Sequence, residues 1–261
     1  MPANIIELNN AENILLNFIL PRIQSDRGDK FIRFVQIGAN IGNVDGDPIF
    51  QFVNQNLWKG LLIEPLPHVF EELKRQLSHV DDLMFANCAI SNETGTKTLY
   101  YPEEQTVLAS FDPNLVMAHL PDKGTPLKEQ EVRCDTLENI LTEHGIDYLD
   151  VLVTDTEGHD AQILLGTDFS KITPHTILFE AKHLSNEDRA AAAQHLEKFG
   201  YLVIEMGANT LALKPTAETL DFCHLMKDIF AQFRMMEARS MLIVQQLINF
   251  ANTISQNTPR G

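Results

Sequence analysis

Basic residues, cysteines and long hydrophobic runs are all scarce in this sequence of 261 residues. Lys and Arg number 20 against 36 Asp and Glu, which gives a formal net charge of −16. Binding to the phosphates of a nucleic acid requires clustered Lys and Arg, and an anionic membrane surface attracts the same residues. We therefore expect no nucleic-acid partner and no membrane partner. The charge favours a substrate that is small and neutral or cationic, or that is brought by a carrier.

The cysteines Cys88, Cys134 and Cys223 are far apart in the sequence and form no CxxC pair. This pattern fits reduced thiols better than a disulfide framework or a zinc site. No apolar run reaches the ~20 residues that a membrane-spanning helix needs. The N-terminus also lacks the basic and apolar regions of a signal peptide. The sequence therefore predicts a soluble, cytoplasmic protein.

Short apolar segments alternate with amphipathic segments between residues 31 and 214. Apolar segments of strand length occur at 31–37, 60–64, 83–90, 96–101, 131–134, 150–155 and 176–180. Strands that alternate with helices form a parallel sheet whose two faces are both covered. A hairpin predicted from residues 201–206 and 210–214 adds an antiparallel strand. The weakly patterned segment 102–129 predicts a lid or a substrate wall.

Both ends of the chain predict helices outside this alternation. Residues 3–24 have apolar side chains at helical spacing. From Phe222 to Ile254 the apolar residues step by alternating four and three, which is typical of a coiled-coil seam. A helix of about 35–40 residues is too long to pack on one small domain. We therefore expect the C-terminal helix to pair with a second copy and make a homodimer.

A turn with two glycines follows the first predicted strand, and an acid ends the second. Gly38 and Gly42 suit a tight turn whose backbone comes close to a ligand. Glu64 follows at about the 20-residue offset at which nucleotide-binding folds present an acid to ribose. Asp45 takes the place of the third glycine of the dinucleotide fingerprint, and Asp47 comes soon after it. Carboxylates there would repel a diphosphate but not a sulfonium, which favours S-adenosylmethionine over NAD.

Acids and one histidine gather where two later strands end. Asp155, Glu157, His159 and Asp160 follow the strand at 150–155, and Glu180 ends the next strand. Open sheets bind ligands at this edge, where such a cluster can orient a hydroxyl, act as general base, or hold a hard divalent cation. The alternative for Glu157 and Asp160 is to stabilise the start of the following helix, and the alternative for His159 is a surface position on that helix.

These motifs, in this order, resemble the FkbM family of S-adenosylmethionine-dependent methyltransferases. The matching segments are 36–42, 63–65, 87–91, 132–137 and 154–158, within residues 31–214. The resemblance implies a class I methyltransferase fold, a Rossmann-like α/β three-layer sandwich. Its mostly parallel seven-stranded sheet has an antiparallel last strand. Residues 1–30 and 215–261 would then be an N-terminal helical extension and a long C-terminal helix for oligomerisation.

The resemblance also implies methyl transfer, most often to a hydroxyl of a sugar or secondary metabolite. The residues that it assigns to the cofactor are Gln36, Gly38, Ala39, Asn40, Gly42, Glu64, Pro65, Ala89 and Asp155. We expect catalysis from Asp155, Glu157, His159 and Glu180, and a Mg²⁺ ion on Asp155 and Glu180.

Two positions depart from the family pattern. Gln36 stands where the first strand of the family carries an acid, and Val153 stands where the family has a lysine. The loss of that lysine leaves the acids less compensated, which favours a divalent metal or a cationic substrate. Two other functions remain open: a non-catalytic cofactor-binding and dimerisation module with a degenerate methyltransferase fold, and an NAD-dependent oxidoreductase.

Overall fold

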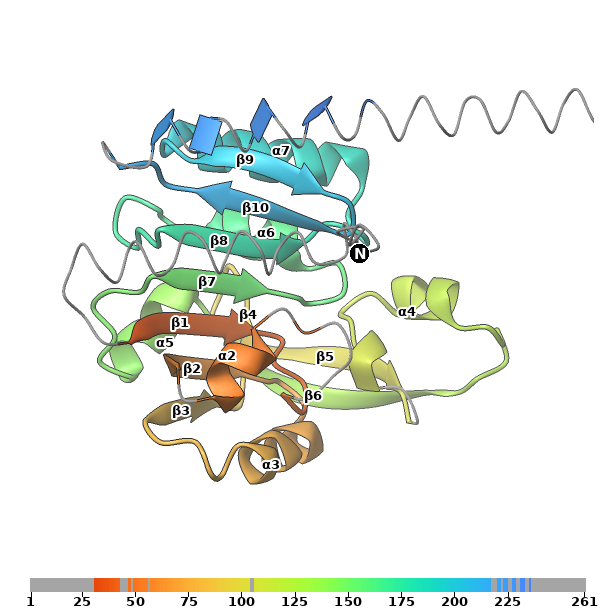
Figure 1. Cartoon of the computed structure of the whole chain (residues 1–261). Coiled ribbons are helices and arrows are strands. Elements are labelled where there is room, and N and C mark those ends of the chain that lie inside the picture. The colour runs from red at the N-terminus through yellow and green to blue at the C-terminus, as the bar shows by residue number, and fades with distance from the viewer. Residues whose placement is uncertain are drawn as a thin grey trace, which may run out of the picture. The chain divides into compact units, whose positions relative to one another are not determined.

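The computed structural model describes residues 31–42, 47, 49–55, 57–103 and 106–216, together with scattered helical positions between Leu220 and Met235 (Figure 1). The chain divides into two compact units, residues 1–215 and residues 216–261. The helix predicted at residues 3–24, Asp45, and most of the predicted dimer helix lie outside the described residues. Among the helices that are described, none has the length and apolar character needed to cross a membrane.

A seven-stranded sheet forms the centre of the first unit. Its strands lie in the order β3 (Leu83–Ala86), β2 (Trp58–Ile63), β1 (Ile32–Ile37), β7 (Val151–Thr154), β8 (Thr176–Glu180), β10 (Asn209–Leu213) and β9 (Leu202–Met206). All neighbouring strands are parallel except β10, which is antiparallel to both β8 and β9. The mostly parallel seven-stranded sheet with an antiparallel last strand is thus confirmed.

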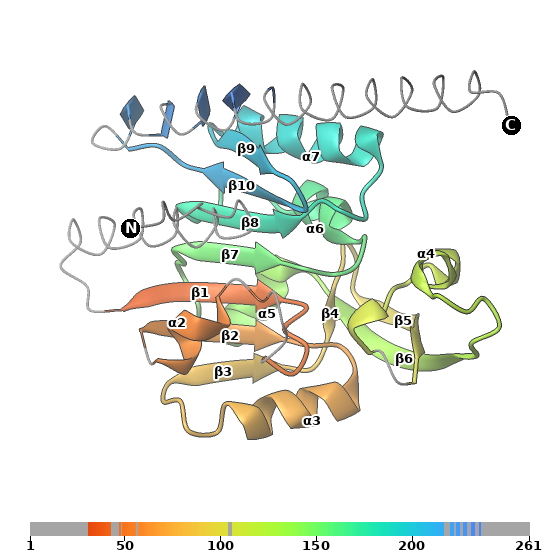
Figure 2. The same cartoon turned by 45° about the vertical axis from the view of Figure 1, so that its right-hand side comes forward.

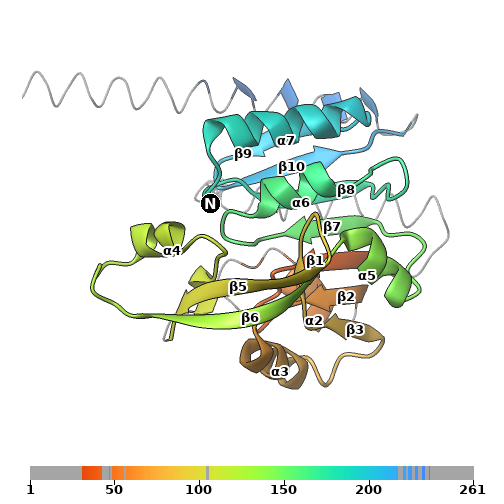
Figure 3. The same cartoon turned by 180° about the vertical axis from the view of Figure 1, so that it is seen from behind.

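Helices cover both faces of this sheet, as an α/β sandwich requires. Helices α5 (Leu137–Glu143), α6 (Asp160–Gly166) and α7 (Asn186–Lys198) lie on the face seen in Figure 3. Helix α2 (Phe50–Asn54) lies on the opposite face, where Phe52 stacks on Trp58 with ring centroids 4.7 Å apart. Helix α3 (Pro67–Gln76) follows β2 and leads into β3.

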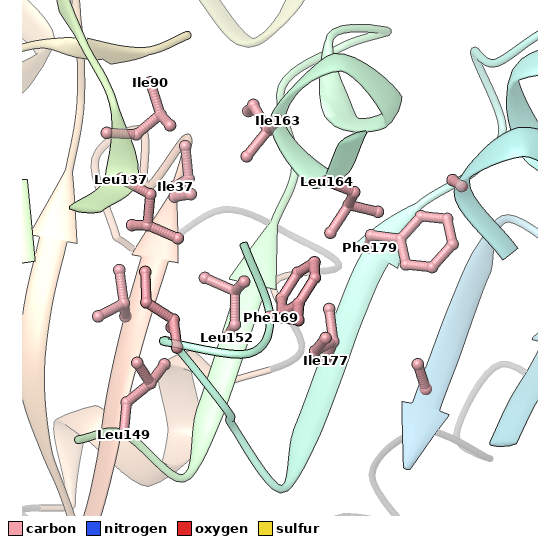
Figure 4. Packing of buried hydrophobic residues seen from close by; sticks show 14 of the residues in the cluster. Ile37, Ile90, Leu137, Leu149, Leu152, Ile163, Leu164, Phe169, Ile177 and Phe179 are labelled. Carbon is pink, nitrogen blue, oxygen red and sulfur yellow. The ribbon is translucent and has the colours of Figure 1, made fainter. Parts of the chain in front are cut away.

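The main hydrophobic core lies between the sheet and helices α5, α6 and α7. Figure 4 shows side chains of the central strands together with Leu137 of α5, Ile163 and Leu164 of α6, and Phe169, which is fully buried. Ala192 and Leu196 of α7 belong to the same core. Leu152 and Ile177 are likewise inaccessible to solvent. Burying one such side chain contributes about 1.5–3 kcal/mol, so the middle strands are held firmly while their carboxyl ends remain free to carry polar residues.

A second, smaller sheet adjoins the first. Its order is β4 (Ala89–Ile90), β6 (Leu127–Asp135) and β5 (Gly95–Pro102), with β6 parallel to β4 and antiparallel to β5. The prediction of one strand over 83–90 is therefore wrong, because the chain passes from one sheet to the other at Asn87. The Asn87 side-chain amide donates hydrogen bonds to the carbonyls of Glu64 and Pro65, at 2.8 and 3.0 Å.

The segment predicted as a lid or wall contains a helix that the sequence analysis missed. Residues Thr106–Leu108 form a 3₁₀ turn, and α4 spans Pro113–His119. The carboxylate of Asp112 accepts a hydrogen bond from the N–H of Asn114 at 2.8 Å, so an N-cap followed by proline starts this helix. Strands β5 and β6 and helix α4 project beyond the carboxyl ends of β1 and β7 (Figures 1 and 2).

Candidate functional site

A cavity of about 450 Å³ lies at the carboxyl ends of β1, β2, β7 and β8. The strand order reverses between β1 and β7, which is where open α/β sheets bind ligands. Small-molecule sites have volumes of about 300–1,000 Å³. Residues 106–111 of the segment between β5 and β6 form a further part of the cavity wall.

The turn after β1 is fixed by close backbone contacts. Gly38 has a positive φ of 80°, and a Cβ atom at this position would lie 1.8 Å from the carbonyl oxygen of Asp155. The N–H groups of Gly38 and Ala39 both donate to the carbonyl of Ile63 at 3.0 Å. Only glycine fits here, because the ends of β1, β2 and β7 meet at this point. Gly38, Ala39 and Asn40 all line the cavity.

Gly42 has a different place from the one that the resemblance implies. It also has a positive φ, of 78°, but a Cβ atom here would lie 2.9 Å from Leu73 and 3.1 Å from Leu77. Gly42 is not among the residues that line the cavity. The close approach that this glycine permits is made to helix α3, so its role is packing.

Glu64 is buried at the cavity wall, with 5% of its surface exposed. Its Oε2 accepts the N–H of Asn40 at 3.0 Å, and its Oε1 accepts the N–H of Leu66 at 2.9 Å. Burial raises the pKa of Glu64 to about 7, although the two N–H groups act in the opposite direction. A carboxylate has about four lone-pair sites, so Glu64 can hold the turn and still accept hydroxyl groups of a ligand.

An acid from further along the chain compensates for the glutamine in β1. The side-chain amide of Gln36 donates to Oδ2 of Asp47 at 2.8 Å, and both residues line the cavity. The other oxygen of Asp47 accepts the N–H groups of Ile49 and Phe50. Burial raises the pKa of Asp47. Asp47 therefore brings a carboxylate next to Gln36 in the cavity wall, although the first strand itself carries none.

An apolar part of the wall follows Glu64. Pro65, Cys88, Ala89 and Ile90 line the cavity here. Cys88 is fully buried, and burial raises the pKa of its thiol to about 12, so it stays neutral. Pro65 and Ala89, which the resemblance assigns to the cofactor, thus both lie in this part of the cavity wall.

The structure separates the acids after β7 into two groups. Asp155 and Glu157 line the cavity together with Glu180 from the end of β8. Asp160 is fully buried, and its carboxylate accepts hydrogen bonds from the N–H and the hydroxyl of Thr156. Asp160 thus stabilises the start of α6, which was the alternative given for it.

Asp155 and Glu180 influence each other's protonation. Burial, and then the charges of neighbouring acids, raise the pKa of both carboxyl groups. Asp155 is exposed at the cavity wall whereas Glu180 is buried, so burial acts chiefly on Glu180 and the neighbouring charges act on both. The pair therefore keeps a proton to higher pH than isolated carboxyl groups do.

His159 lies in the cavity wall with an unsatisfied ring nitrogen. Its Nε2 is buried and has no hydrogen-bond partner among the described residues. The ring meets Phe111 edge-on, with centroids 5.0 Å apart. Burial, with a smaller effect of Lys97, lowers the pKa of His159 to about 4. The imidazole is thus neutral, and its Nε2 is buried beside the cavity.

Sequence reasoning missed two residues just after β8. Lys182 lines the cavity. The side chain of His183 is 3% exposed, and its Nε2 lies 3.0 Å from Oε2 of Glu157 and 3.6 Å from Oε1 of Glu180. The position of Lys182 just after the strand that Glu180 ends is a signal that could have found it, whereas the contact of His183 with Glu157 depends on how the turn after β7 folds.

The wall formed by residues 106–111 is fastened to the turn after β7. The hydroxyl of Ser110 donates to the carbonyl of Glu157 at 3.2 Å. A Cβ atom at Gly158 would lie 2.6 Å from Leu115, so α4 packs directly on this turn. Glu157 and Gly158 have positive φ values of 52° and 101°. The acids and the wall above them are therefore positioned together.

The family profile described as "Methyltransferase FkbM domain" matches residues 36–203. The chain belongs to the FkbM methyltransferase family. The resemblance seen in the motifs is confirmed, and with it a methyltransferase that uses S-adenosylmethionine. We therefore set aside the oxidoreductase alternative. No curated protein matches the chain.

Solved structures of similar fold include the N-terminal domain of human METTL16 in complex with SAH, which is 11% identical with a TM-score of 0.43 over 78% of this chain and 70% of that chain. Aeropyrum pernix fibrillarin with natively bound S-adenosyl-L-methionine is 9% identical, with a TM-score of 0.39 over 78% and 73%. A putative RNA methyltransferase from Pyrococcus horikoshii is 11% identical, with a TM-score of 0.36 over 75% and 70%. The family match and the mostly parallel seven-stranded sheet with its antiparallel strand together give the class I methyltransferase fold.

The exclusion of nucleic acid as a partner is wrong. It was based on the net charge of −16, but the similar structures include the putative RNA methyltransferase and a pre-rRNA processing protein, the fibrillarin of Methanococcus jannaschii. Net charge alone does not exclude a substrate class, because recognition depends on how charge is distributed over the surface. The comparisons also give no support to the predicted homodimer or to Mg²⁺ on Asp155 and Glu180.

Proposed function

We propose that this FkbM methyltransferase methylates a hydroxyl oxygen of a small molecule or a sugar. The observation that carries the proposal is that a single cavity is lined by two groups of residues. The first group is the turn after β1, with Glu64 and Ala89. The second group is Asp155, Glu180 and the neutral His159, and residues 106–111 line the same cavity. We call these groups the first and the second part of the cavity.

The donor groups of the first part fit S-adenosylmethionine, a cation with an adenosyl group. In this proposal Asp47 accepts the amino group of the methionine part, in place of the acid absent at Gln36. Glu64 accepts the ribose hydroxyls, and the apolar residues Ala89 and Ile90 lie beside adenine; all four residues line the cavity. Five carboxylates line the cavity, namely Asp47, Glu64, Asp155, Glu157 and Glu180. They favour a positively charged ligand.

The second part of the cavity can receive the proton that the acceptor loses. When bound, the cofactor supplies a methyl group that is already activated on a sulfonium, so an acceptor oxygen in line with it is the main requirement. As the acceptor oxygen takes up this methyl group, its hydroxyl proton would pass to the Asp155–Glu180 pair. Raised pKa values suit this pair to a base working near neutral pH.

The charge around the acceptor narrows its class. Among the described residues, Lys182 is the one lysine or arginine that lines the cavity, against five carboxylates. We therefore expect a neutral or cationic acceptor, whose apolar part lies against residues such as Phe111 and Leu99.

The test is methyl transfer to a panel of hydroxyl compounds, with formation of S-adenosylhomocysteine as the readout. Sugars and hydroxylated small molecules form one arm, and RNA and protein fractions form another. For the acceptor that reacts, we expect Asp155→Asn and Glu180→Gln each to reduce kcat by about 100- to 10,000-fold. Glu129→Gln, a change of an exposed carboxylate on β6, serves as the control.

Three results would contradict the proposal. An unchanged kcat in both Asp155→Asn and Glu180→Gln would show that this pair does not accept the proton. Methylation of RNA or protein, without methylation of any small hydroxyl compound, would show that the acceptor class is wrong. Absence of heat on mixing with S-adenosylhomocysteine at high micromolar concentration would favour the degenerate, non-catalytic module.

A further inference from the structure

We propose that Glu157, Glu180 and His183 form a binding site for a divalent transition-metal ion of the zinc type. This site lies at the edge of the cavity, because Glu157 and Glu180 line the cavity while His183 closes the cluster from behind them. It differs from the Mg²⁺ site predicted from the sequence in two of its ligands and in its class of metal. Metal binding also goes beyond the methyl transfer proposed above, and with an ion on Glu180 the proton of the acceptor would pass to Asp155.

The spacing of the three side chains matches a metal site. One ligand atom from each residue lies within 4.8 Å of the others. The two distances from His183 Nε2 are 3.0 Å to Glu157 Oε2 and 3.6 Å to Glu180 Oε1. Zinc binds nitrogen and carboxylate oxygen at about 2.0–2.2 Å in tetrahedral geometry, which places neighbouring ligand atoms about 3.4 Å apart. Both distances from His183 are near this value, and the two carboxylates, whose ligand atoms lie within 4.8 Å of each other, would close around an ion by rotation of their side chains.

An unsatisfied oxygen gives a second, independent indication of a ligand. Only 10% of the Glu180 side chain is exposed. Its Oε2 is buried and receives no hydrogen bond from any described residue. This oxygen belongs to the same carboxylate whose Oε1 faces His183. Buried acceptors in native proteins have partners, so a proton shared with Asp155 or a bound cation must satisfy it.

The types of the ligands favour a transition metal over Mg²⁺. Mg²⁺ prefers an all-oxygen set that retains several waters, and His183 contributes an imidazole nitrogen. Imidazole suits zinc, iron, copper and nickel. Two carboxylates and one histidine are a three-residue protein set of the kind that leaves a further position for water or substrate. Such a site also supplies the positive charge that this acidic wall lacks.

The surrounding structure holds the ligands in place. Glu180 is the last residue of β8, whose backbone is paired with β10. The main chain of Glu157 is held by the hydroxyl of Ser110. The ring of His183 packs edge-on against the ring of His119, with centroids 4.2 Å apart. His119 is thus the nearest competing imidazole, and it provides the matched control.

The test is a titration of the full chain, stripped with a chelator, with Zn²⁺ alone, followed by calorimetry and by metal analysis after dialysis. We expect one ion per chain. Loss of even an outer partner of a metal ligand costs about 10- to 100-fold in affinity, so Glu180→Gln and His183→Ala should each weaken binding by more than about 100-fold. His119→Ala should bind as the unsubstituted chain does.

Several outcomes would overturn the inference. These are no zinc binding at pH 7.5, full binding by the His183→Ala variant, or loss of binding in His119→Ala equal to that in His183→Ala. His183→Ala can disturb packing, whereas Glu180→Gln keeps the shape of the side chain. Both variants are first shown to unfold cooperatively, and the zinc affinity of Glu180→Gln is then judged separately. Titration with S-adenosylhomocysteine distinguishes this inference from the proposed function. Zinc binding without cofactor binding would refute only the proposed function. Cofactor binding without zinc binding would refute only the metal site.

Discussion

Replacing Glu64 by glutamine tests the role of the buried acid at the end of β2. Both of its oxygens accept backbone N–H groups, from Asn40 and from Leu66. A glutamine side chain offers one acceptor oxygen and one NH₂ group, which cannot accept. In Glu64→Gln the N–H of Asn40 or of Leu66 then faces the NH₂ group of the glutamine and has no acceptor. An unsatisfied buried donor lowers the free energy of unfolding by about 1–3 kcal/mol.

The pH dependence of this effect follows from the pKa of Glu64. Burial raises it from 4.5 to about 7, so the folded chain holds the proton more tightly than the unfolded chain. The stability that the proton contributes is complete below the unfolded pKa and is lost as the pH rises through about 7. The pKa difference corresponds to a loss of about 2–3 kcal/mol between about pH 5 and 7.5. The stability advantage of the native chain over Glu64→Gln should therefore shrink as the pH rises.

Urea unfolding measures this advantage. Trp58 is the single tryptophan of the chain and is 3% exposed, so its fluorescence reports unfolding. The free energy of unfolding is compared at pH 5 and pH 7.5 for the native chain, for Glu64→Gln, and for the exposed control Glu129→Gln. An advantage over Glu64→Gln that stays constant or grows with pH would refute the reasoning.

The same substitution tests the proposed contact with ribose. Hydrogen bonds to a charged group contribute about 1.5–3 kcal/mol each, so Glu64→Gln should weaken S-adenosylhomocysteine binding by about 10- to 100-fold or more at pH 8. In the native chain the affinity should rise with pH up to about 7, since the ionised carboxylate is the better acceptor. Equal affinity of both chains at pH 8 would remove Glu64 from the cofactor site.

Two further substitutions test the packing of the fold by urea unfolding. Gly38→Ala combines a positive φ with a clash against the carbonyl of Asp155, and should cost at least about 3 kcal/mol. Gly145→Ala has a positive φ and no atom within 4 Å of the new Cβ, and should cost about 1–2 kcal/mol; equal losses would show that the clash is relieved without cost. Tyr201→Phe removes a buried hydrogen bond to the carbonyl of Pro174, 2.8 Å long, and should cost about 1–2 kcal/mol. No loss there would mean that the carbonyl finds another donor.

The order of strands and helices was predictable because buried parallel strands need continuous apolar runs. The strand predicted at 176–180 is β8, Thr176–Glu180. The apolar run at 83–90 led to a wrong prediction of one strand because continuous apolar residues indicate a single buried strand. Ala86, Cys88 and Ala89 are all buried, so no polar gap in the sequence marks the boundary between the two strands that occupy this run. The feature that separates them is the hydrogen bonding of Asn87 to the chain after β2, a long-range contact that periodicity does not contain.

The acids of the site were predictable and two other features were not. Glu64, Asp155 and Glu180 follow strands, and the carboxyl ends of parallel strands meet at one edge. The position of Gly42 was not predictable, because a positive φ serves a ligand contact and a packing contact equally well, and only the fold brings α3 to it. His183 comes after the strand end, and its contact with Glu157 depends on how the turn after β7 folds.

The pairing of β5 with β6 has a consequence for how this enzyme can change. Residues Gly95–Pro102 pair along their whole length with Leu127–Asp135, down to the pair formed by Pro102 and Leu127. The segment between these strands, which contains α4, therefore begins and ends on a paired ladder. Substitutions in this segment can alter one wall of the cavity without breaking the pairing of β5 with β6, provided that the contacts of Ser110 and Leu115 with the turn after β7 are kept.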